Sequence, residues 1–215
     1  AFSDCGLSWN WDEELYGELL SIPGGRQRMQ HYGERLGRRV DDELLGRLRH
    51  SKQQYYLDVV ASGAVTLRPG VGRLLEELHR ADVQQWIVTS SGKSSVQALL
   101  QSMSADLTGI FAGMVTADDV ERHKPHPDPY LLALDLSGAN PEAVLVLEDS
   151  TPGLAAARAA GLRCLLTPSP WDTELERSQH QAHAAVDQLG EADQPASIFK
   201  GPPCAEGLIT LEYLQ

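Results

Sequence analysis

Long apolar runs, paired cysteines and an excess of basic charge are all missing from this 215-residue sequence. No apolar stretch approaches the roughly 20 residues that a helix needs to cross a bilayer. The first residues, AFSDCGLSWNWDEEL, do not contain the basic, apolar and small-residue sections of a signal peptide in that order. We therefore expect a protein of the cytoplasm with no membrane partner.

Cysteine is scarce, and its pattern excludes two classes of small domain. Cys5, Cys164 and Cys204 are odd in number, and no two of them lie at metal-ligand spacing. Neither a disulfide scaffold nor a zinc site is supported. Reduced thiols are the expectation, which agrees with a cytoplasmic location.

Basic side chains are outnumbered, with 18 Lys and Arg against 30 Asp and Glu and a formal net charge of −12 at pH 7. Nucleic acid and anionic lipid carry the same sign, so this balance disfavours both as main partners. A small anionic ligand stays compatible, because a single site can be locally positive. We expect a small molecule as the ligand and no nucleic acid.

Residues 1–62 are predicted to form helices. Apolar residues recur at helical spacing from Trp11 to Ile22, and the Pro-Gly-Gly sequence that follows is expected to end this helix in a loop. Another helix start is predicted at Asp41 and Asp42, which precede a group of leucines.

Residues 63–215 have a different pattern, in which short apolar runs alternate with helical segments. Strands are predicted at 86–88, 111–116, 144–147 and 162–166, with an Asp-Pro pair at 128 and 129 capping one of the intervening helices. The alternation predicts an α/β fold whose parallel sheet is covered by helices on both faces. The tail from 195 to 207 is expected to be irregular.

Parallel sheets bind ligands at the carboxyl ends of their strands, and the first such end carries hydroxyls. The segment Thr-Ser-Ser-Gly-Lys, residues 89–93, precedes a predicted helix. Hydroxyls and free backbone N–H groups at a helix N-terminus can hold an anion. The alternative is that Ser91 or Ser94 only caps the helix.

The second group is Lys124, in the sequence His-Lys-Pro-His-Pro. The two prolines stiffen the backbone around this lysine, which can then neutralise a phosphate as a point charge. The alternative is an exposed lysine in a proline-rich turn. His123 and His126 are interpreted as loop residues, because no third metal ligand is evident.

The third group is the acid pair Glu148 and Asp149, directly after an apolar strand. Adjacent carboxylates at a buried strand end are costly unless a cation or hydrogen-bond donors satisfy them. Mg²⁺ binds through one or two carboxylates together with phosphate oxygens and water. The alternative, that Asp149 or Ser150 caps the next helix, explains one acid and leaves the other without a role.

The order hydroxyl, lysine and acid pair on successive strands resembles the haloacid dehalogenase superfamily of phosphatases and phosphomutases. IVTSSG resembles its second motif, HKPHPDPY its third and VLVLEDSTPGLAAARAAG its fourth. The beta-phosphoglucomutase-like group is the most similar. Within it, GLSWNWDEELYGELL, PGGRQR and AAVDQLGE resemble the sugar-bisphosphate phosphatase branch, which includes xylulose bisphosphate phosphatases. The resemblance implies a helical cap over 1–62 and a Rossmann-like core over 63–215.

One motif of this family is missing. Its first motif, DxDGT, supplies an aspartate nucleophile and a second aspartate as general acid and base, and it does not occur here. Asp4, followed by Cys-Gly-Leu, matches neither the motif nor its position. The resemblance implies that the motif lies upstream, on a strand that pairs between the strands ending near Ser90 and at Glu148. The 215 residues alone are then expected to be inactive.

The resemblance also implies the chemistry, which is phosphoryl transfer through an aspartyl-phosphate followed by hydrolysis. Ser90 would hydrogen-bond the transferring phosphoryl group, Lys124 would balance its charge, and the acid pair would hold Mg²⁺. The expected substrate is a small phosphorylated sugar or bisphosphate, bound by a monomer. The residues assigned to substrate binding are Ser91, Lys93, Arg26 in the glycine-rich loop for a second phosphate, and Arg28 as its alternative.

Two other functions stay open. A sugar phosphomutase would use the same core and return the phosphoryl group to the substrate. A non-catalytic phosphate-binding or regulatory protein would lack the first motif altogether.

Overall fold

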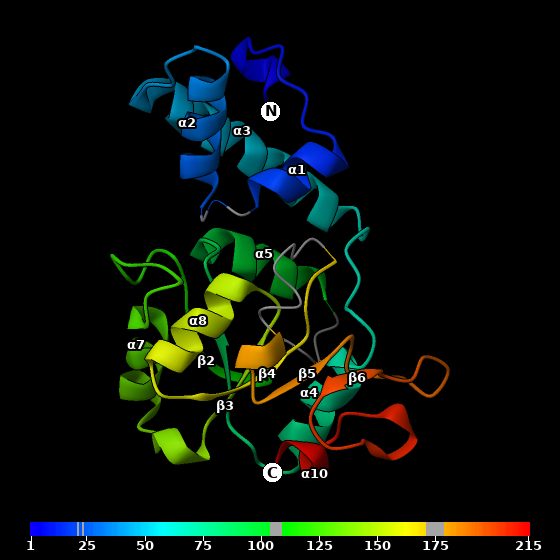
Figure 1. Ribbon diagram of the computed structural model, residues 1–215. Coiled ribbons are helices and arrows are strands. Elements are labelled where there is room, and N and C mark those ends of the chain that lie inside the picture. The colour runs from blue at the N-terminus through cyan, green and yellow to red at the C-terminus, as the bar shows by residue number, and fades with distance from the viewer. Residues whose placement is uncertain (21, 23, 104–108, 171–178) are drawn as a thin grey trace. The chain divides into compact units, whose positions relative to one another are not determined.

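The computed structural model describes the whole chain except residues 21, 23, 104–108 and 171–178. The chain divides into two compact units, Ala1–Val65 and Thr66–Gln215 (Figure 1). This division lies close to the boundary predicted at residue 62. Within the described residues, no helix combines the length and the apolar character needed to cross a bilayer.

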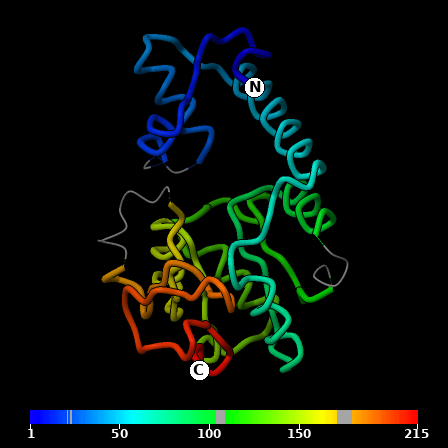
Figure 2. The backbone as a smooth tube through the Cα atoms, turned by 90° about the vertical axis from the view of Figure 1, so that its right-hand side faces the viewer, coloured from blue at the N-terminus to red at the C-terminus, as the bar shows by residue number. Residues whose placement is uncertain are grey.

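The N-terminal unit is helical. Its elements are η1 (Ser3–Cys5), α1 (Glu13–Leu19), α2 (Gly25–Arg35) and α3 (Asp42–Ala61). The helix start predicted at Asp41 and Asp42 is confirmed, since the Asp41 carboxylate accepts a hydrogen bond from Leu44 N at 2.9 Å. From there α3 continues along the unit as one long helix (Figure 2). Its buried leucines, Leu44, Leu45 and Leu48, form the core of the unit together with residues from η1 and α2.

The predicted helix from Trp11 to Ile22 is shorter in the structure. Asp12 ends the extended segment before α1, and its carboxylate accepts from Leu15 N at 2.9 Å, so Trp11 lies outside the helix. A carboxylate that caps the first turn satisfies a backbone N–H that has no partner within the helix. This local hydrogen bond sets the start of α1, and the apolar spacing does not.

The C-terminal unit is α/β, which confirms the predicted fold class. Its elements are α4 (Val71–Arg80), β1 (Gln85–Val88), α5 (Lys93–Ser102), β2 (Phe111–Val115), α7 (Asp128–Ser137), η2 (Pro141–Ala143), β3 (Leu145–Glu148), α8 (Thr151–Ala159), β4 (Arg163–Leu166), β5 (Ala184–Val186), β6 (Ile198–Lys200), η3 (Ala205–Gly207) and α10 (Leu211–Leu214).

The strands of this unit form two sheets. β1 pairs with β2 in parallel, while β3, β4 and β5 form a second parallel group that β6 extends in the antiparallel direction. Among the described residues, β1 and β3 are each the outermost strand of their sheet, and neither pairs with the other. Each therefore presents one edge of backbone N–H and C=O groups that no strand of the described chain covers.

Within the second sheet, β4 is buried on both faces from Cys164 to Leu166. Cys164 and Leu166 belong to the hydrophobic cluster that includes Ala156 of α8, while Leu165 between them belongs to the cluster with Leu74 of α4. Successive side chains of a strand point to opposite faces. A strand whose consecutive residues are all apolar is consequently covered by helices on both sides, as expected for a parallel sheet.

The tail predicted to be irregular contains the short strand β6, which pairs with β5. Prolines at 195, 202 and 203 flank β6 without interrupting it. Edge strands tolerate nearby prolines, because one side of the strand makes no ladder hydrogen bonds. The composition of the tail therefore did not indicate this three-residue strand.

Candidate active site

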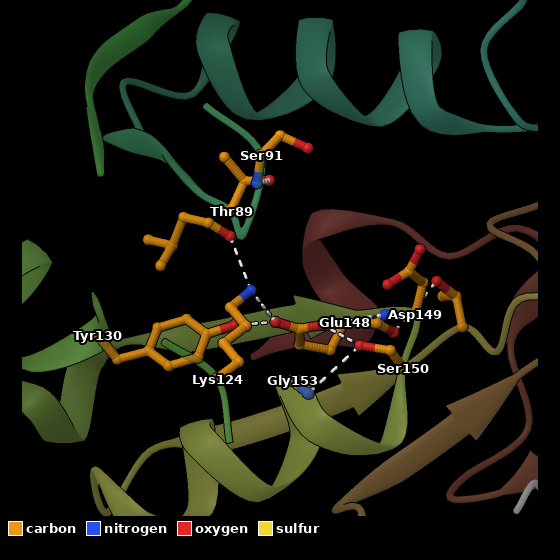
Figure 3. A network of polar contacts seen from close by, with 10 residues as sticks. Thr89, Ser91, Lys124, Tyr130, Glu148, Asp149, Ser150 and Gly153 are labelled. Atoms are coloured by element: carbon orange, nitrogen blue, oxygen red, sulfur yellow. Dashed lines mark hydrogen bonds and ion pairs between the residues drawn. The ribbon is translucent and has the colours of Figure 1, made fainter. Parts of the chain in front are cut away.

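Lys124 connects the two sheets at the carboxyl ends of their strands. Its Nζ donates a hydrogen bond to the carbonyl oxygen of Val88, the last residue of β1, at 2.8 Å. The same ammonium forms an ion pair with Oε1 of Glu148, the last residue of β3 (Figure 3). The side chains of Lys124 and Glu148 are only 9% and 5% exposed. Lys124 is thus not the exposed lysine of a proline-rich turn.

The segment that carries Lys124 is fixed by a second ion pair. Arg122 donates from Nε and Nη2 to the two carboxylate oxygens of Asp128 at 2.8 and 2.9 Å. Such two-point pairs fix geometry as well as adding energy. Asp128 is the first residue of α7 and makes no capping hydrogen bond, so its predicted role as the N-cap is wrong. Pairing with Arg122 instead closes the loop around Lys124.

Tyr130 completes the contacts of this buried pair. Its hydroxyl donates to Oε1 of Glu148, and its ring lies below the ammonium of Lys124, 5.0 Å from Nζ to the ring centroid. Burial, followed by the negative charge of Glu148, raises the pKa of Tyr130 above the ordinary value of 10.0. The phenol is therefore protonated at neutral pH and acts as a donor. Sequence reasoning missed Tyr130, although it lies within the stretch that resembles the third motif.

The predicted acid pair divides into one buried and one exposed carboxylate. Among the described residues, Oε2 of Glu148 accepts two long hydrogen bonds, from Asp149 N at 3.3 Å and from Ser150 Oγ at 3.4 Å. Asp149 is exposed. The helix cap is Ser150, whose Oγ accepts from Gly153 N at 3.3 Å. Capping by Ser150 leaves both carboxylates available for another role.

Gly153 lies directly beneath the Glu148 carboxylate. A Cβ added at this glycine would overlap the carboxylate atoms. The first turn of α8 can therefore approach Glu148 only because residue 153 has no side chain. This close approach holds the carboxylate between α8 and Tyr130 of α7.

The segment after β1 contains Ser90, Ser91 and Lys93. The side chains of all three are exposed, as an anion site would require. The expectation that a serine caps α5 is wrong, because Gly92 is the N-cap and the carboxylate of Asp118 accepts from Lys93 N at 2.8 Å. Ser91 N donates to Thr89 Oγ1 at 3.1 Å.

Asp118 is a second residue that sequence reasoning missed. It follows β2, and the neighbouring Ala117 N donates to Ser91 O at 3.0 Å. The loop after β2 thus fixes the segment that contains Ser90. One of the backbone donors predicted for an anion is already used by this carboxylate.

Arg26 lies in the first turn of α2, so the prediction that it occupies a glycine-rich loop is wrong. Gly24 and Gly25 adjoin the start of a helix, whereas glycine pairs more often follow a helix end. Arg26 Nη2 pairs with Asp42 Oδ1 at 2.6 Å, and both side chains are more than half exposed. Arg28 lies with its guanidinium carbon 5.8 Å from the Tyr16 ring centroid.

Two carboxylates at the end of β3 provide hard oxygen donors of the kind that Mg²⁺ prefers. Glu148 Oε2 makes two long hydrogen bonds with the described residues, so its bonding to the protein is weaker than that of Oε1. No group of three or more His, Cys, Asp or Glu side chains with metal-site geometry occurs in the part of the chain that the structure describes. The pair therefore fits part of a magnesium site and would need oxygens from substrate, water or another segment.

Known proteins are similar to this chain in sequence. The sequence model of the haloacid dehalogenase-like hydrolase family matches residues 24–167. The chain is 40% identical over 171 residues to protein CbbY of Rhodobacter capsulatus, covering 79% of this chain and 75% of that protein. It is 35% identical over 202 residues to the plasmid-encoded CbbY of Cupriavidus necator, covering 91% and 78%.

A solved structure is similar over most of both chains. It is a mutant of CbbY from Rhodobacter sphaeroides in complex with xylulose-(1,5)bisphosphate. The TM-score is 0.78 and the identity 31%, over 89% of this chain and 84% of that one.

Proposed function

Because this chain belongs to the haloacid dehalogenase-like hydrolase family, we propose that it is a Mg²⁺-dependent phosphatase that removes phosphate from a small sugar bisphosphate. The observation that carries the proposal is the buried Lys124–Glu148 pair where β1 and β3 end. A positive charge beside a carboxylate at the carboxyl ends of parallel strands suits a phosphate and its cation. We also propose that the N-terminal unit serves as the cap, and that the enzyme is a cytoplasmic monomer.

In this proposal Lys124 balances the charge of the transferring phosphoryl group. An ammonium that is shielded from water interacts more strongly with a developing negative charge than an exposed one does. Its contact with the Val88 carbonyl holds it at the end of β1, two residues before Ser90. Ser90 donates its hydroxyl hydrogen to the same phosphoryl group.

The nucleophile in this proposal is an aspartate of a DxDGT motif, which forms an aspartyl-phosphate that water then hydrolyses. The motif does not occur in the 215 residues. Support for its place comes from the sheets, since β1 and β3 each have one edge that no strand of the described chain covers. A strand between these edges would put its carboxyl end beside Lys124.

Glu148 and Asp149 are proposed as the residues of this chain that hold Mg²⁺. When bound, the ion would neutralise phosphate oxygens and orient them. Glu148 contributes a buried, fixed carboxylate and Asp149 an exposed one. Two carboxylates are part of a sphere of about six oxygens.

The substrate class is proposed from the relative that binds xylulose-(1,5)bisphosphate and from cations in both units. Ser91 and Lys93 are assigned to the phosphate at the core site. Arg26 is assigned to the second phosphate, because its ion pair with Asp42 is exposed and exposed pairs cost little to exchange. Arg28, held against Tyr16, is the alternative.

The test uses the protein extended upstream to include the first motif. It is incubated with Mg²⁺ and xylulose 1,5-bisphosphate, and in parallel with a hexose 1-phosphate, and phosphate release is measured. We expect rapid release from the bisphosphate that disappears when Mg²⁺ is chelated. Isomerised hexose phosphate without phosphate release would instead identify a mutase, and phosphate binding without turnover a non-catalytic protein.

A further inference from the structure

The two oxygens of the Glu148 carboxylate have unequal partners (Figure 3). Oε1 accepts from both the Lys124 ammonium and the Tyr130 hydroxyl. Within the part of the chain that the structure describes, Oε2 accepts from Asp149 N and Ser150 Oγ, at 3.3 and 3.4 Å. Hydrogen bonds that involve a charged group and a short donor distance are the stronger ones. Oε1 is thus held by two strong hydrogen bonds, whereas Oε2 is held by two weak ones.

Tyr130 is well suited to fix this asymmetry. It is 4% exposed, and its ring belongs to the cluster that contains Val146 of β3 and Leu154 of α8. A movement of the ring that took the hydroxyl away from Glu148 would disturb its packing against both β3 and α8. The ammonium of Lys124 lies over the same ring, 5.0 Å from its centroid, so Tyr130 holds both members of the ion pair.

Cations differ in how many oxygens they take from one carboxylate. Mg²⁺ requires near-octahedral geometry at about 2.0–2.1 Å and binds few protein oxygens, while Ca²⁺ accepts six to eight oxygens at about 2.3–2.6 Å and readily takes both oxygens of one carboxylate. When one oxygen of a carboxylate is held by other hydrogen-bond donors, the carboxylate can bind a cation only through its second oxygen. Such a ligand disfavours Ca²⁺ more than Mg²⁺.

We propose that Tyr130 is a positioning residue that keeps Glu148 Oε1 beside Lys124, leaves Oε2 as the oxygen for a divalent cation, and so favours Mg²⁺ over Ca²⁺. This inference rests on the proposed function, in that Glu148 is a metal ligand. A merely structural role for Tyr130, satisfying a buried carboxylate, would affect folding stability and leave the preference between the two cations unchanged.

The test measures the cation preference of the protein extended upstream to include the first motif, because the 215 residues supply only part of the ligand set. Mn²⁺ bound to the protein is displaced by Mg²⁺ or by Ca²⁺, and free Mn²⁺ is followed by electron paramagnetic resonance. The variants are Tyr130→Phe, which keeps the ring and removes the hydroxyl, and Tyr213→Phe as the matched control. Tyr213 lies in α10, and within the described residues its hydroxyl has no hydrogen-bond partner.

We expect the ratio of Mg²⁺ to Ca²⁺ affinity to fall by about threefold or more in Tyr130→Phe. A hydrogen bond to a charged group typically contributes roughly tenfold or more to an equilibrium constant, and part of this opposes binding through Oε1. Taking a ratio cancels any general change in the charge of the site. The Tyr213→Phe ratio should equal that of the wild type, and an unchanged ratio in Tyr130→Phe would overturn the inference.

A second measurement needs no tyrosine variant. Infrared difference spectra of the wild type with and without Ca²⁺, assigned by comparison with Glu148→Gln, distinguish one-oxygen from two-oxygen binding by the carboxylate. One-oxygen binding is expected, and two-oxygen binding in the wild type would contradict the role of Tyr130.

Glu148→Gln and Asp149→Asn separate this inference from the proposed function. Both should abolish specific Mn²⁺ binding. If neither does, the proposed metal site is wrong and the inference fails with it. If both do while the ratio in Tyr130→Phe stays at the wild-type value, the metal site stands and only the inference fails.

Discussion

Replacing Lys124 by methionine should destabilise the C-terminal unit strongly, even before any effect on catalysis. Methionine keeps much of the apolar stem and removes the ammonium. Glu148, whose side chain is 5% exposed, then loses its ion-pair partner. Removing one member of a buried pair typically costs about 3–5 kcal/mol, because a buried charge is left uncompensated. Tyr130 continues to donate to Glu148, so we expect about 3 kcal/mol.

The assay is urea denaturation of the 215-residue chain, followed by circular dichroism and intrinsic fluorescence. Lys93→Met is the matched control, because this lysine lies in the same unit and its side chain is exposed. Substitutions at such positions usually change stability by less than about 0.5 kcal/mol. The double variant Lys124→Met with Glu148→Gln should recover part of the loss, since no uncompensated carboxylate remains. Equal midpoints for Lys124→Met and Lys93→Met would refute a buried, stabilising pair.

Three further predictions concern the same region. Calorimetry of the 215-residue chain should show only weak Mg²⁺ binding, because two carboxylates are an incomplete set of ligands; tight binding would show that the site is complete without the first motif. Gly153→Ala should lower the melting temperature, because the new Cβ would overlap Glu148 and overpacking typically costs about 1–3 kcal/mol. The control is Gly46→Ala, which has open space around the new Cβ and should be neutral or stabilising. Asp118→Ala should lower the free energy of unfolding in urea by about 1 kcal/mol, because α5 loses its cap. Asp118→Asn should keep most of that stability, because its amide oxygen can still accept from Lys93 N. Equal losses in the two variants would contradict the capping role.

The parts of the fold that follow from local rules could be predicted from the sequence. The apolar runs of β1, β2, β3 and β4 are short and bounded by turn residues, and the helices between them have regular apolar spacing. The start of α3 was predictable, because an aspartate cap acts within one helical turn. The grouping of Lys124 and Glu148 also followed, since the carboxyl ends of parallel strands lie at one edge of a sheet.

Contacts between distant segments could not be predicted in this way. Asp118 caps α5 from 25 positions away in the chain, and no local pattern distinguishes it from the adjacent Asp119. Tyr130 reaches Glu148 across 18 positions, and an apolar helix face explains a tyrosine there equally well. Arg26 was misplaced because Gly-Gly is a common helix stop, while here Gly25 is the first residue of α2.

The central claim is that a phosphoryl group passes from a sugar bisphosphate to an aspartate beside Lys124. The most direct measurement is mass spectrometry of the extended protein, rapidly quenched in acid during turnover of xylulose 1,5-bisphosphate and digested. The account predicts one phosphoryl group on the first aspartate of the DxDGT motif, and none on the peptide with Glu148 and Asp149 or on the 215-residue chain treated alone. Turnover without a phosphorylated aspartate, or phosphorylation at another residue, would contradict it.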